Sequence, residues 1–303
     1  MKTFSIIIPS FNSKDYIQNA IDSITNLNYP KNLIEVIIVD DGSTDDSFEL
    51  VNQMIKTYDY FKQVKKVNGN WGSVINFVKN NQLVHHDLIT ILDSDDQLTA
   101  DALKIANQKI ANHDFFAGSF HLFNGKKKLR KIRRYWFLFK RILKDKKQMN
   151  SPYCLPIGYF VSKNVFYQID DLRENCAFQD AVYFSEITKR SQTMIFTKKS
   201  TGLYYYKRPG NSNTLEWDYD KRFEPVLYSC YQMIKNDAHE CVSFQLNRKI
   251  FYKMLNKYQI KFEINRKLKF KWFPWYFQWI YFLFIFLPKQ KKFFINKKDD
   301  IKQ

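Results

Sequence analysis

The sequence predicts an α/β fold in which helices cover both faces of a sheet. Over the first 110 residues, continuous apolar runs of strand length alternate with segments whose apolar residues have helical spacing, as in βαβ units. The runs do not alternate between apolar and polar residues, so both faces of the sheet should be buried. The 303 residues, 45% of them hydrophobic, suffice for one large domain with an appendage or for two small domains.

The elements follow one another in a simple order. "FSIIIP" should form the first strand, and Tyr16–Ile24 the first helix, because its apolar residues recur at helical spacing. "LIEVIIVD" and "DLITILD" are expected strands, whereas Phe48–Tyr58 and "WGSVINFVKNNQ" are expected helices. Later strands are expected in "DFFAGSFHLF", "YCLPIGYFVSKNVF" and "MIFTKKSTGLYYYK". We therefore predict an α/β domain at 1–215, a helical extension at 216–270 and an aromatic, basic segment with a tail at 271–303.

The formal net charge of +18 predicts an anionic partner, which could be nucleic acid, a phosphorylated substrate or a membrane surface. The excess lies in 126–147 and near the C-terminus. Trp272–Leu287 would be a helix of roughly 24 Å, shorter than the ~30 Å hydrocarbon core, and lysines flank it. This pattern favours an in-plane or shallow re-entrant anchor over a full span, although a core helix or a homo-oligomer contact is the alternative.

The four cysteines form no CxxC pair, and "MKTFSIIIPSF" is not typical of a signal peptide. We therefore expect reduced thiols and a location at the cytoplasmic face of the plasma membrane.

Two of the apolar runs end in carboxylates. Asp40 and Asp41 follow one run, and Gly42 permits a tight turn after them. Ligands of open α/β sheets bind outside such strand ends, although either aspartate could simply cap a helix. In "ILDSDD", the carboxylates of Asp93, Asp95 and Asp96 repel one another unless a cation or hydrogen bonds compensate, and a hard divalent ion takes oxygen ligands of this kind.

Four motifs, "SIIIPSFN", "VIIVDDGSTDDS", "NGNWGSVIN" and "ILDSDD", occur in the order and at roughly the spacing found in family 2 glycosyltransferases with the GT-A fold. The chain resembles this family over about residues 4–210. The resemblance implies a mixed, Rossmann-like sheet and an inverting enzyme of the bacterial surface-polysaccharide type. It also implies a nucleotide-sugar donor, most often a UDP-sugar, lying across the strand ends.

The resemblance assigns roles to individual positions. The residues implied to bind the nucleotide are Pro9, Phe11, Asp40, Asp41, Asn68, Gly72, Asn76, Asp93 and Ser94. Among them, Asp41 matches the carboxylate that contacts the uracil edge, and Asp93 matches the one that contacts ribose. Asp95 matches the ligand of a divalent metal, Mn²⁺ or Mg²⁺. The family often has Arg-Asn where this chain has Ile75-Asn76, so no guanidinium is available there.

A Glu-Asp pair of the family corresponds to Gln179-Asp180 in "RENCAFQDAVYFSEI". The resemblance implies that Asp180 is the general base that deprotonates the acceptor hydroxyl, and a helix cap is the alternative. One carboxylate suffices for a single inverting displacement. Further along, Lys207 and Arg208 could contact a diphosphate or lie on a solvated loop.

We therefore expect transfer of a sugar to a hydroxyl of a glycan or polyprenyl-linked acceptor, in the synthesis of surface polysaccharide or teichoic-type polymers. A nucleotidyltransferase would usually show a Gly-rich signature after the first strand, which "PSFNSKDY" is not. A basic nucleic-acid-binding protein would explain the charge but not the acidic motifs. A catalytically weak scaffold is a further alternative, suggested by Gln179.

Overall fold

The computed structural model describes residues 1–132, 155–176, 179–206 and 208–209. All of them belong to the first of two compact units, Met1–Gln245, whereas the second unit, Leu246–Gln303, lies outside the described residues. The predicted helical extension at 216–270 and the predicted membrane-associating segment at 271–303 also lie outside them, so both stay predictions.

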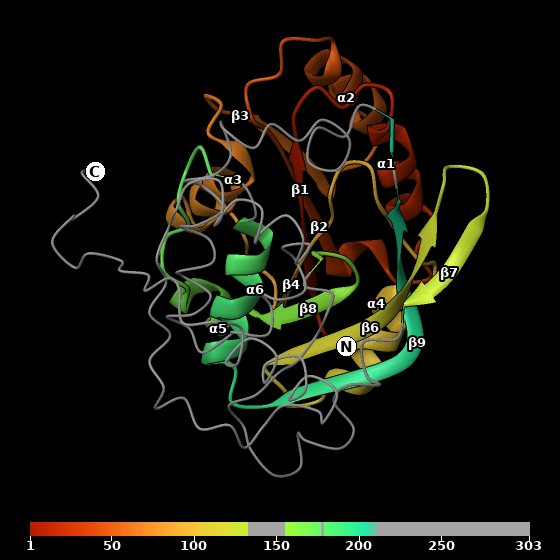
Figure 1. Ribbon diagram of the computed structural model, residues 1–303, viewed down its shortest axis with the longest axis vertical. Coiled ribbons are helices and arrows are strands. Elements are labelled where there is room, and N and C mark those ends of the chain that lie inside the picture. Colours follow the sequence, from red (N-terminus) through yellow and green to blue (C-terminus); the bar gives the residue numbers. More distant parts are fainter. Residues whose placement is uncertain (133–154, 177–178, 207, 210–303) are drawn as a thin grey trace, which may run out of the picture. The chain divides into compact units, whose positions relative to one another are not determined.

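The described residues form nine strands and six α-helices (Figure 1). The strands are β1 (Phe4–Ser10), β2 (Ile34–Asp40), β3 (Phe61–Lys65), β4 (Leu88–Ile91), β5 (Gln97–Leu98), β6 (Phe115–Phe123), β7 (Lys128–Ile132), β8 (Tyr159–Ser162) and β9 (Met194–Tyr205). The helices are α1 (Ile17–Thr25), α2 (Ser47–Ile55), α3 (Asn70–Asn80), α4 (Ala102–Ile110), α5 (Lys163–Gln168) and α6 (Gln179–Arg190), with a 3-10 turn at Lys31–Leu33.

The strands form one mixed sheet in the order β3-β2-β1-β4-β8-β6-β9-β5, and β7 pairs with β6 outside this path. Strands β3, β2, β1 and β4 are parallel. Strand β8 is antiparallel to both β4 and β6, so β6 runs in the same direction as β4. The C-terminal ends of β1, β2, β4 and β6 therefore lie at one edge, which we call the carboxyl edge of the sheet.

Each face of the sheet is buried under three helices, as the continuous apolar runs predict. Alternate side chains of β1 point to opposite faces, so Ile6 joins the core under α1, α2 and α4, whereas Ile7 joins the core under α3, α5 and α6. Helix α1 contributes its apolar stripe of Ile17, Ala20, Ile21 and Ile24 to the first core. The predicted α/β fold with helices on both faces is thus confirmed.

Two segments differ from the elements predicted for them, which were a strand at 153–166 and no strand in the basic segment 126–147. The segment 153–166 contains a short strand, β8, followed at once by helix α5, where Ser162 Oγ accepts a hydrogen bond from the Val165 amide. The start of the basic segment 126–147 forms strand β7 and hence a hairpin with β6. Lysines and arginines alone give no strand signal, and the pairing comes from β6, whose Phe120 lies opposite Ile132.

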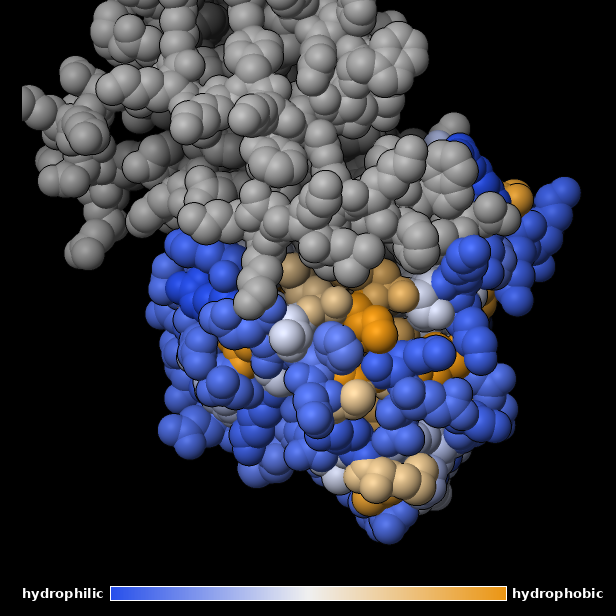
Figure 2. Space-filling model, turned by 90° about the horizontal axis from the view of Figure 1, so that it is seen from below, coloured by the Kyte–Doolittle hydropathy of each residue, from blue (hydrophilic) through white to orange (hydrophobic). Residues whose placement is uncertain are grey.

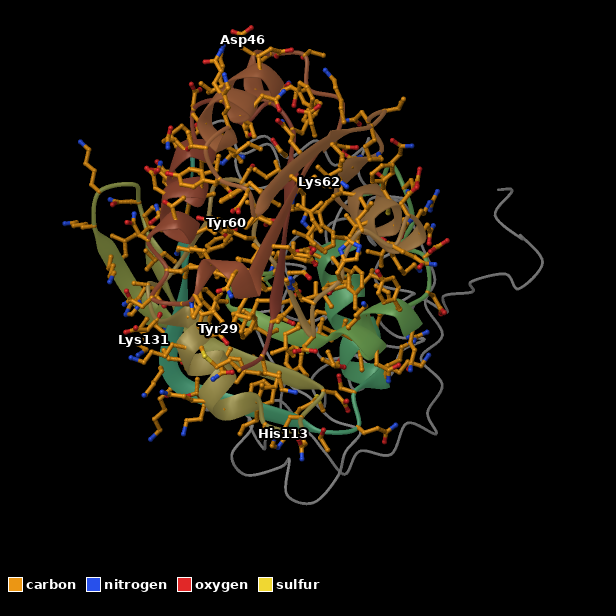
Figure 3. The ribbon with its side chains drawn as sticks, turned by 180° about the vertical axis from the view of Figure 1, so that it is seen from behind. Tyr29, Asp46, Tyr60, Lys62, His113 and Lys131 are labelled. Atoms are coloured by element: carbon orange, nitrogen blue, oxygen red, sulfur yellow. The ribbon has the colours of Figure 1, made fainter. Side chains whose placement is uncertain are left out.

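The hairpin stands at the side of the sheet. Figure 3 shows Lys131 of β7 at the margin of the described residues, whereas Lys62 of β3 lies nearer the middle of the view. In Figure 2, the hairpin is a mostly hydrophilic projection at the right of the described surface. Among the described residues, no helix combines the length and the apolar character that crossing a bilayer requires.

Candidate active site

The candidate site lies at the carboxyl edge of the sheet, where β1 extends beyond its pairing with β4. Strand β1 pairs with β2 as far as Ser10, but its pairing with β4 ends at Ile7. Pro9, which has no amide hydrogen, therefore lies beyond the last residue of β1 that pairs with β4. Phe11 follows in the loop with 49% of its surface exposed, so this edge offers an apolar face to a ligand.

The two aspartates after β2 have different environments. Asp40 is buried, and its Oδ1 accepts hydrogen bonds from the amides of Gly42 and Ser43, at 3.1 and 2.9 Å. It therefore holds the tight turn at Gly42, where φ is +76° and a Cβ would lie 2.9 Å from the Asn68 amide nitrogen. Its Oδ2 is buried and has no partner among the described residues.

Asp41 is held by a cation and by backbone. Its Oδ1 lies 2.7 Å from Nζ of Lys66, in an ion pair whose two side chains are both largely buried. The amide of Gly69 also donates to this carboxylate, at 3.1 Å, and Lys66 Nζ donates further to Ser73 Oγ at 2.8 Å. Asn68 donates its side-chain amide to the Asp41 carbonyl at 2.8 Å. The loop after β3 is thereby fixed against the end of β2.

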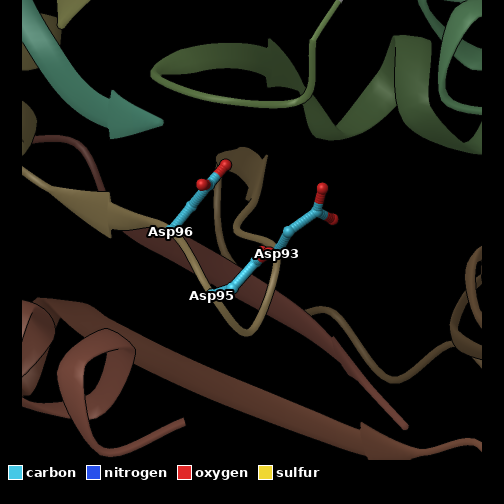
Figure 4. A group of neighbouring side chains, drawn as sticks. All are labelled: Asp93, Asp95 and Asp96. Carbon is cyan, nitrogen blue, oxygen red and sulfur yellow. The ribbon is translucent and has the colours of Figure 1, made fainter. Parts of the chain in front are cut away.

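Three carboxylates project from the short loop between β4 and β5 (Figure 4). Asp93, Asp95 and Asp96 each offer one carboxylate oxygen, and these three oxygen atoms lie within 4.8 Å of one another. Asp93 accepts a hydrogen bond from Trp71 Nε1 at 2.8 Å, and Asp96 Oδ1 accepts one from the Tyr205 amide at 2.8 Å. Asp96 is fully buried, and its Oδ2 has no partner among the described residues. Ser94 lies half-buried in the turn between them.

Arg208 supplies a positive charge to this cluster. Its Nε lies 2.6 Å from Asp95 Oδ2, and its guanidinium lies over the ring of Tyr16, 4.5 Å from the ring centre. Tyr16 in turn donates its hydroxyl hydrogen bond to the carbonyl of Pro209 at 3.1 Å. Arg208 is therefore not a freely solvated loop residue, whereas Lys207 lies outside the described residues.

The cluster does not support three full negative charges by itself. Burial, and then the charge of Asp95, raise the pKa of Asp93 to about 8, while the Trp71 hydrogen bond partly opposes them. Burial also raises the pKa of Asp96 well above its usual range and raises that of Asp95, which Arg208 opposes. An all-oxygen donor set with an unpartnered buried oxygen and an excess of carboxylates suits a hard divalent cation, so the residues fit the predicted metal.

Helix α6 brings Asp180 to the same region. Asp180 lies in the first turn of α6, and burial raises its pKa to about 6, against the hydrogen bonds of backbone amides at the helix start. Its charge also raises the pKa of Asp93, so the two carboxylates lie close enough to repel each other. The predicted base and the predicted donor-binding loop are thus adjacent, although they are distant in sequence.

Three further predicted residues hold the segment before α6. The side-chain amide of Asn76 makes two hydrogen bonds with the backbone of Leu172, at 2.7 and 2.8 Å. A Cβ on Gly72 would lie 3.0 Å from the Arg173 carbonyl, so this glycine allows α3 to approach that segment closely. Gln179 Oε1 accepts the Arg173 amide at 3.0 Å. Both polar groups of the Asn76 side chain, predicted to lie beside the nucleotide, are thus hydrogen-bonded to the backbone of Leu172 in this structure.

Three residues of the site do not emerge from the sequence. They are Tyr16, Lys66 and Trp71. Trp71 stood inside a recognised motif, and a buried indole usually needs a hydrogen-bond acceptor, so this signal was available. Lys66 and Tyr16 gave no signal, because their partners are far away in the sequence.

Comparisons with known proteins agree with this geometry. A profile of the family described as Glycosyl transferase family 2 matches residues 5–170. The uncharacterized glycosyltransferase MG060 of Mycoplasma genitalium is 36% identical over 279 residues, which cover 90% of this chain and 92% of that protein. The poly(ribitol-phosphate) beta-N-acetylglucosaminyltransferase TarS of Staphylococcus aureus (strain Mu50) is 25% identical over 289 residues, and the match spans 48% of its length.

Solved structures share the fold. The crystal structure of S. aureus TarS 1–349 in complex with UDP-GlcNAc matches with a TM-score of 0.64 at 18% identity, covering 89% of this chain and 77% of that one. The mannosyltransferase PcManGT from Pyrobaculum calidifontis, in complex with GDP-Man and Mn²⁺, matches with a TM-score of 0.54 at 13% identity, covering 87% and 76%. At these identities the likeness shows the fold, which is the predicted GT-A fold.

Proposed function

The chain belongs to glycosyl transferase family 2, and on that premise we propose that this glycosyltransferase moves a sugar from a UDP-sugar to a hydroxyl of a glycan or polyprenyl-linked glycan, with inversion. The observation that carries the proposal is that Asp180 lies near enough to Asp93 to raise the pKa of that carboxyl, beside a cluster in which Asp93, Asp95 and Asp96 each offer an oxygen within 4.8 Å of the others. Its relative TarS is named for transfer to poly(ribitol-phosphate), which supports an acceptor from surface-polymer synthesis.

The nucleotide end of the donor fits the carboxyl edge beside Asp41. The Asp41 carboxylate, paired with Lys66, can accept a hydrogen bond from an imide N–H, which uracil offers and cytosine does not. Phe11 gives an exposed ring on which a flat base can stack. Guanine also carries an N–H beside its carbonyl, so a GDP-sugar is the alternative that a donor screen has to include.

The diphosphate end fits the cluster of Asp93, Asp95 and Asp96. A divalent cation, Mn²⁺ or Mg²⁺, held through Asp95 would neutralise charge on the departing diphosphate. Asp96 contributes the buried, unpartnered Oδ2 on the same loop. Arg208, at 2.6 Å from Asp95, provides a second positive charge close to where the phosphates would lie.

The chemical step needs one base, and Asp180 has suitable properties. It accepts the proton of the acceptor hydroxyl while that oxygen forms a bond to the anomeric carbon, and the bond from that carbon to the diphosphate oxygen breaks. With a pKa of about 6, Asp180 is mostly charged at pH 7 and is a stronger base than an ordinary aspartate. A single displacement of this kind inverts the anomeric configuration.

A donor screen tests the proposal. Purified protein with Mn²⁺ is incubated with a panel of UDP- and GDP-sugars and a lipid-linked acceptor extract, and nucleoside diphosphate release is measured. We expect release from one UDP-sugar, its loss in EDTA and in Asp180→Asn, and an inverted linkage by NMR coupling constants. Release from GDP-sugars alone would overturn the uridine assignment, and a retained linkage would overturn the mechanism.

A further inference from the structure

The hairpin formed by β6 and β7 carries a concentrated positive charge that the proposed reaction does not use. We call residues 124–132 the basic arm. Its cations are Lys126, Lys127, Lys128, Arg130 and Lys131. Residues 124–130 are all exposed, and no Asp or Glu occurs between Phe115 and Ile132. In the described part of the chain, none of the arm's cations forms an ion pair.

The arm is a fixed structure. The side chain of Asn124 accepts hydrogen bonds from the amides of Lys126 and Lys127, at 3.3 and 3.0 Å, and so holds the turn. Gly125 adopts a φ of +83°, and a Cβ there would lie 2.6 Å from the Tyr205 hydroxyl. The Phe123 ring stacks on Tyr205 with the ring centres 4.9 Å apart. The arm therefore keeps its position relative to the sheet.

The same contacts connect the arm to the candidate active site. Tyr205, on which the base of the arm packs, donates its amide to Asp96. The tip of the arm follows the C-terminal end of β6, which lies at the carboxyl edge together with the ends of β1 and β4. A surface bound by the arm would thus lie on the side of the molecule where the donor and acceptor react.

We propose that the basic arm docks the enzyme on an anionic membrane surface, with the active-site edge turned toward the lipid. Apolar groups accompany the cations, since Leu129 of the arm is 46% exposed and Tyr206, which follows β9 and donates its amide to the Phe123 carbonyl, is 41% exposed. Such groups gain from burial in a bilayer interface but gain little from a hydrated polyanion.

The charges of the arm favour an anionic partner. Burial lowers the pKa of His121, and the charges of Lys128 and Lys131 lower it further, so the field of the arm reaches the neighbouring strand. The cytoplasmic leaflet of a membrane carries negative charge, and it is where a polyprenyl-linked acceptor would be reached. The proposal extends the proposed function through its acceptor, but the binding itself depends only on the arm.

Vesicle binding by the full-length protein tests the proposal. Sedimentation is measured with vesicles of phosphatidylglycerol and phosphatidylcholine at 3:7 and with phosphatidylcholine alone. The test variant combines Lys127→Gln, Lys128→Gln and Arg130→Gln. At about fivefold for each cation beside anionic lipid, we expect affinity for the anionic vesicles to fall about a hundredfold. The matched control combines Lys56→Gln, Lys62→Gln and Lys104→Gln, three exposed lysines elsewhere with the same total charge change, and should bind like the wild type.

Two further measurements separate lipid from other polyanions. Leu129→Ser should weaken binding to anionic vesicles but leave binding to soluble inorganic polyphosphate unchanged. If the arm variant binds anionic vesicles like the wild type, or if the control loses as much affinity, the proposal is wrong. It is also wrong if Leu129→Ser changes nothing while polyphosphate displaces the protein from vesicles, because the arm then recognises phosphate chains.

The outcome is independent of the sugar-transfer proposal. Release of UDP from the donor, with water or a soluble acceptor, should be the same in the arm variant as in the wild type. The three substituted residues contact neither the proposed uracil site beside Asp41 nor Asp180. Vesicle binding that depends on the arm, without any sugar transfer, would support the docking proposal and contradict the proposed reaction. Sugar transfer without arm-dependent vesicle binding would support the proposed reaction and contradict the docking proposal.

Discussion

Asp180 should lower the stability of the folded protein at neutral pH, and its replacement should reveal by how much. Burial raises the pKa of Asp180 from 3.8 to about 6, which corresponds to roughly 3 kcal/mol between the charged and the protonated form. Because the folded state holds the proton more tightly than the unfolded state, this residue favours folding most below pH 3.8. That contribution is lost as the pH rises toward and through 6.

Asp180→Asn keeps the shape of the side chain but carries no charge to desolvate. Relative to the wild type, the variant should gain about 1 kcal/mol at pH 4.5 and about 3 kcal/mol at pH 7.5 in the free energy of unfolding. The assay is urea unfolding in EDTA at both pH values, followed by tryptophan fluorescence. UDP binding should persist, whereas sugar transfer should be abolished.

An exposed aspartate provides the control. Asp59→Asn, in the loop after α2, should change the free energy of unfolding by little at either pH, since its carboxylate stays in water. If Asp180→Asn is no more stable than the wild type at pH 7.5, or if its gain does not increase between the two pH values, the carboxylate is not desolvated as the structure indicates. The assignment of a raised pKa to the base would then be wrong.

Other perturbations give separate tests of the site. Asp95→Asn should weaken Mn²⁺ binding and donor binding together, as measured by calorimetry, and unchanged Mn²⁺ affinity would exclude Asp95 as a ligand. Arg208→Gln removes the cation paired with Asp95, so Mn²⁺ without nucleotide should bind roughly tenfold more tightly, and weaker binding would contradict the pairing. Lys66→Met leaves Asp41 buried and unpaired and should destabilise the fold by roughly 3 kcal/mol, which adding Asp41→Asn should partly restore. Transfer activity should fall as the pH drops below about 6, the pKa of Asp180, and a rate independent of pH between 5 and 8 would argue against this base.

The sequence predicts those parts of the site that lie on contiguous motifs. The carboxylates of Asp93, Asp95 and Asp96 follow a buried strand directly, so strand geometry brings them to the carboxyl edge without further information. Asp180 is identified only through the family resemblance, because nothing local to residue 180 indicates which strand ends lie opposite α6. Its proximity to Asp93 depends on the packing of α6 against α3 and the sheet.

Other parts of the site depend on contacts that the sequence does not encode locally. Lys66 pairs with Asp41 across 25 positions, and Arg208 with Asp95 across more than a hundred. Lysines and arginines are frequent in this chain, so composition gives no reason to single out these two. The arm is a similar case, since its charge was evident but its hairpin geometry follows from pairing with β6.

Helix α3 connects the two halves of the site. At its start, Trp71 donates to Asp93 and packs edge-on against Tyr183 of α6, with ring centres 5.8 Å apart. The next residue, Gly72, lets the segment leading to Asp180 approach, and Asn76, more than one turn later, fixes the backbone of Leu172. A shift of α3 would therefore move Asp93, which is predicted to bind the nucleotide, together with Asp180, the predicted base. This coupling gives a physical reason for "NWGSVIN" to be a unit, because contacts from this motif hold both the loop of Asp93 and the segment before Asp180, whether or not each of its residues touches a nucleotide.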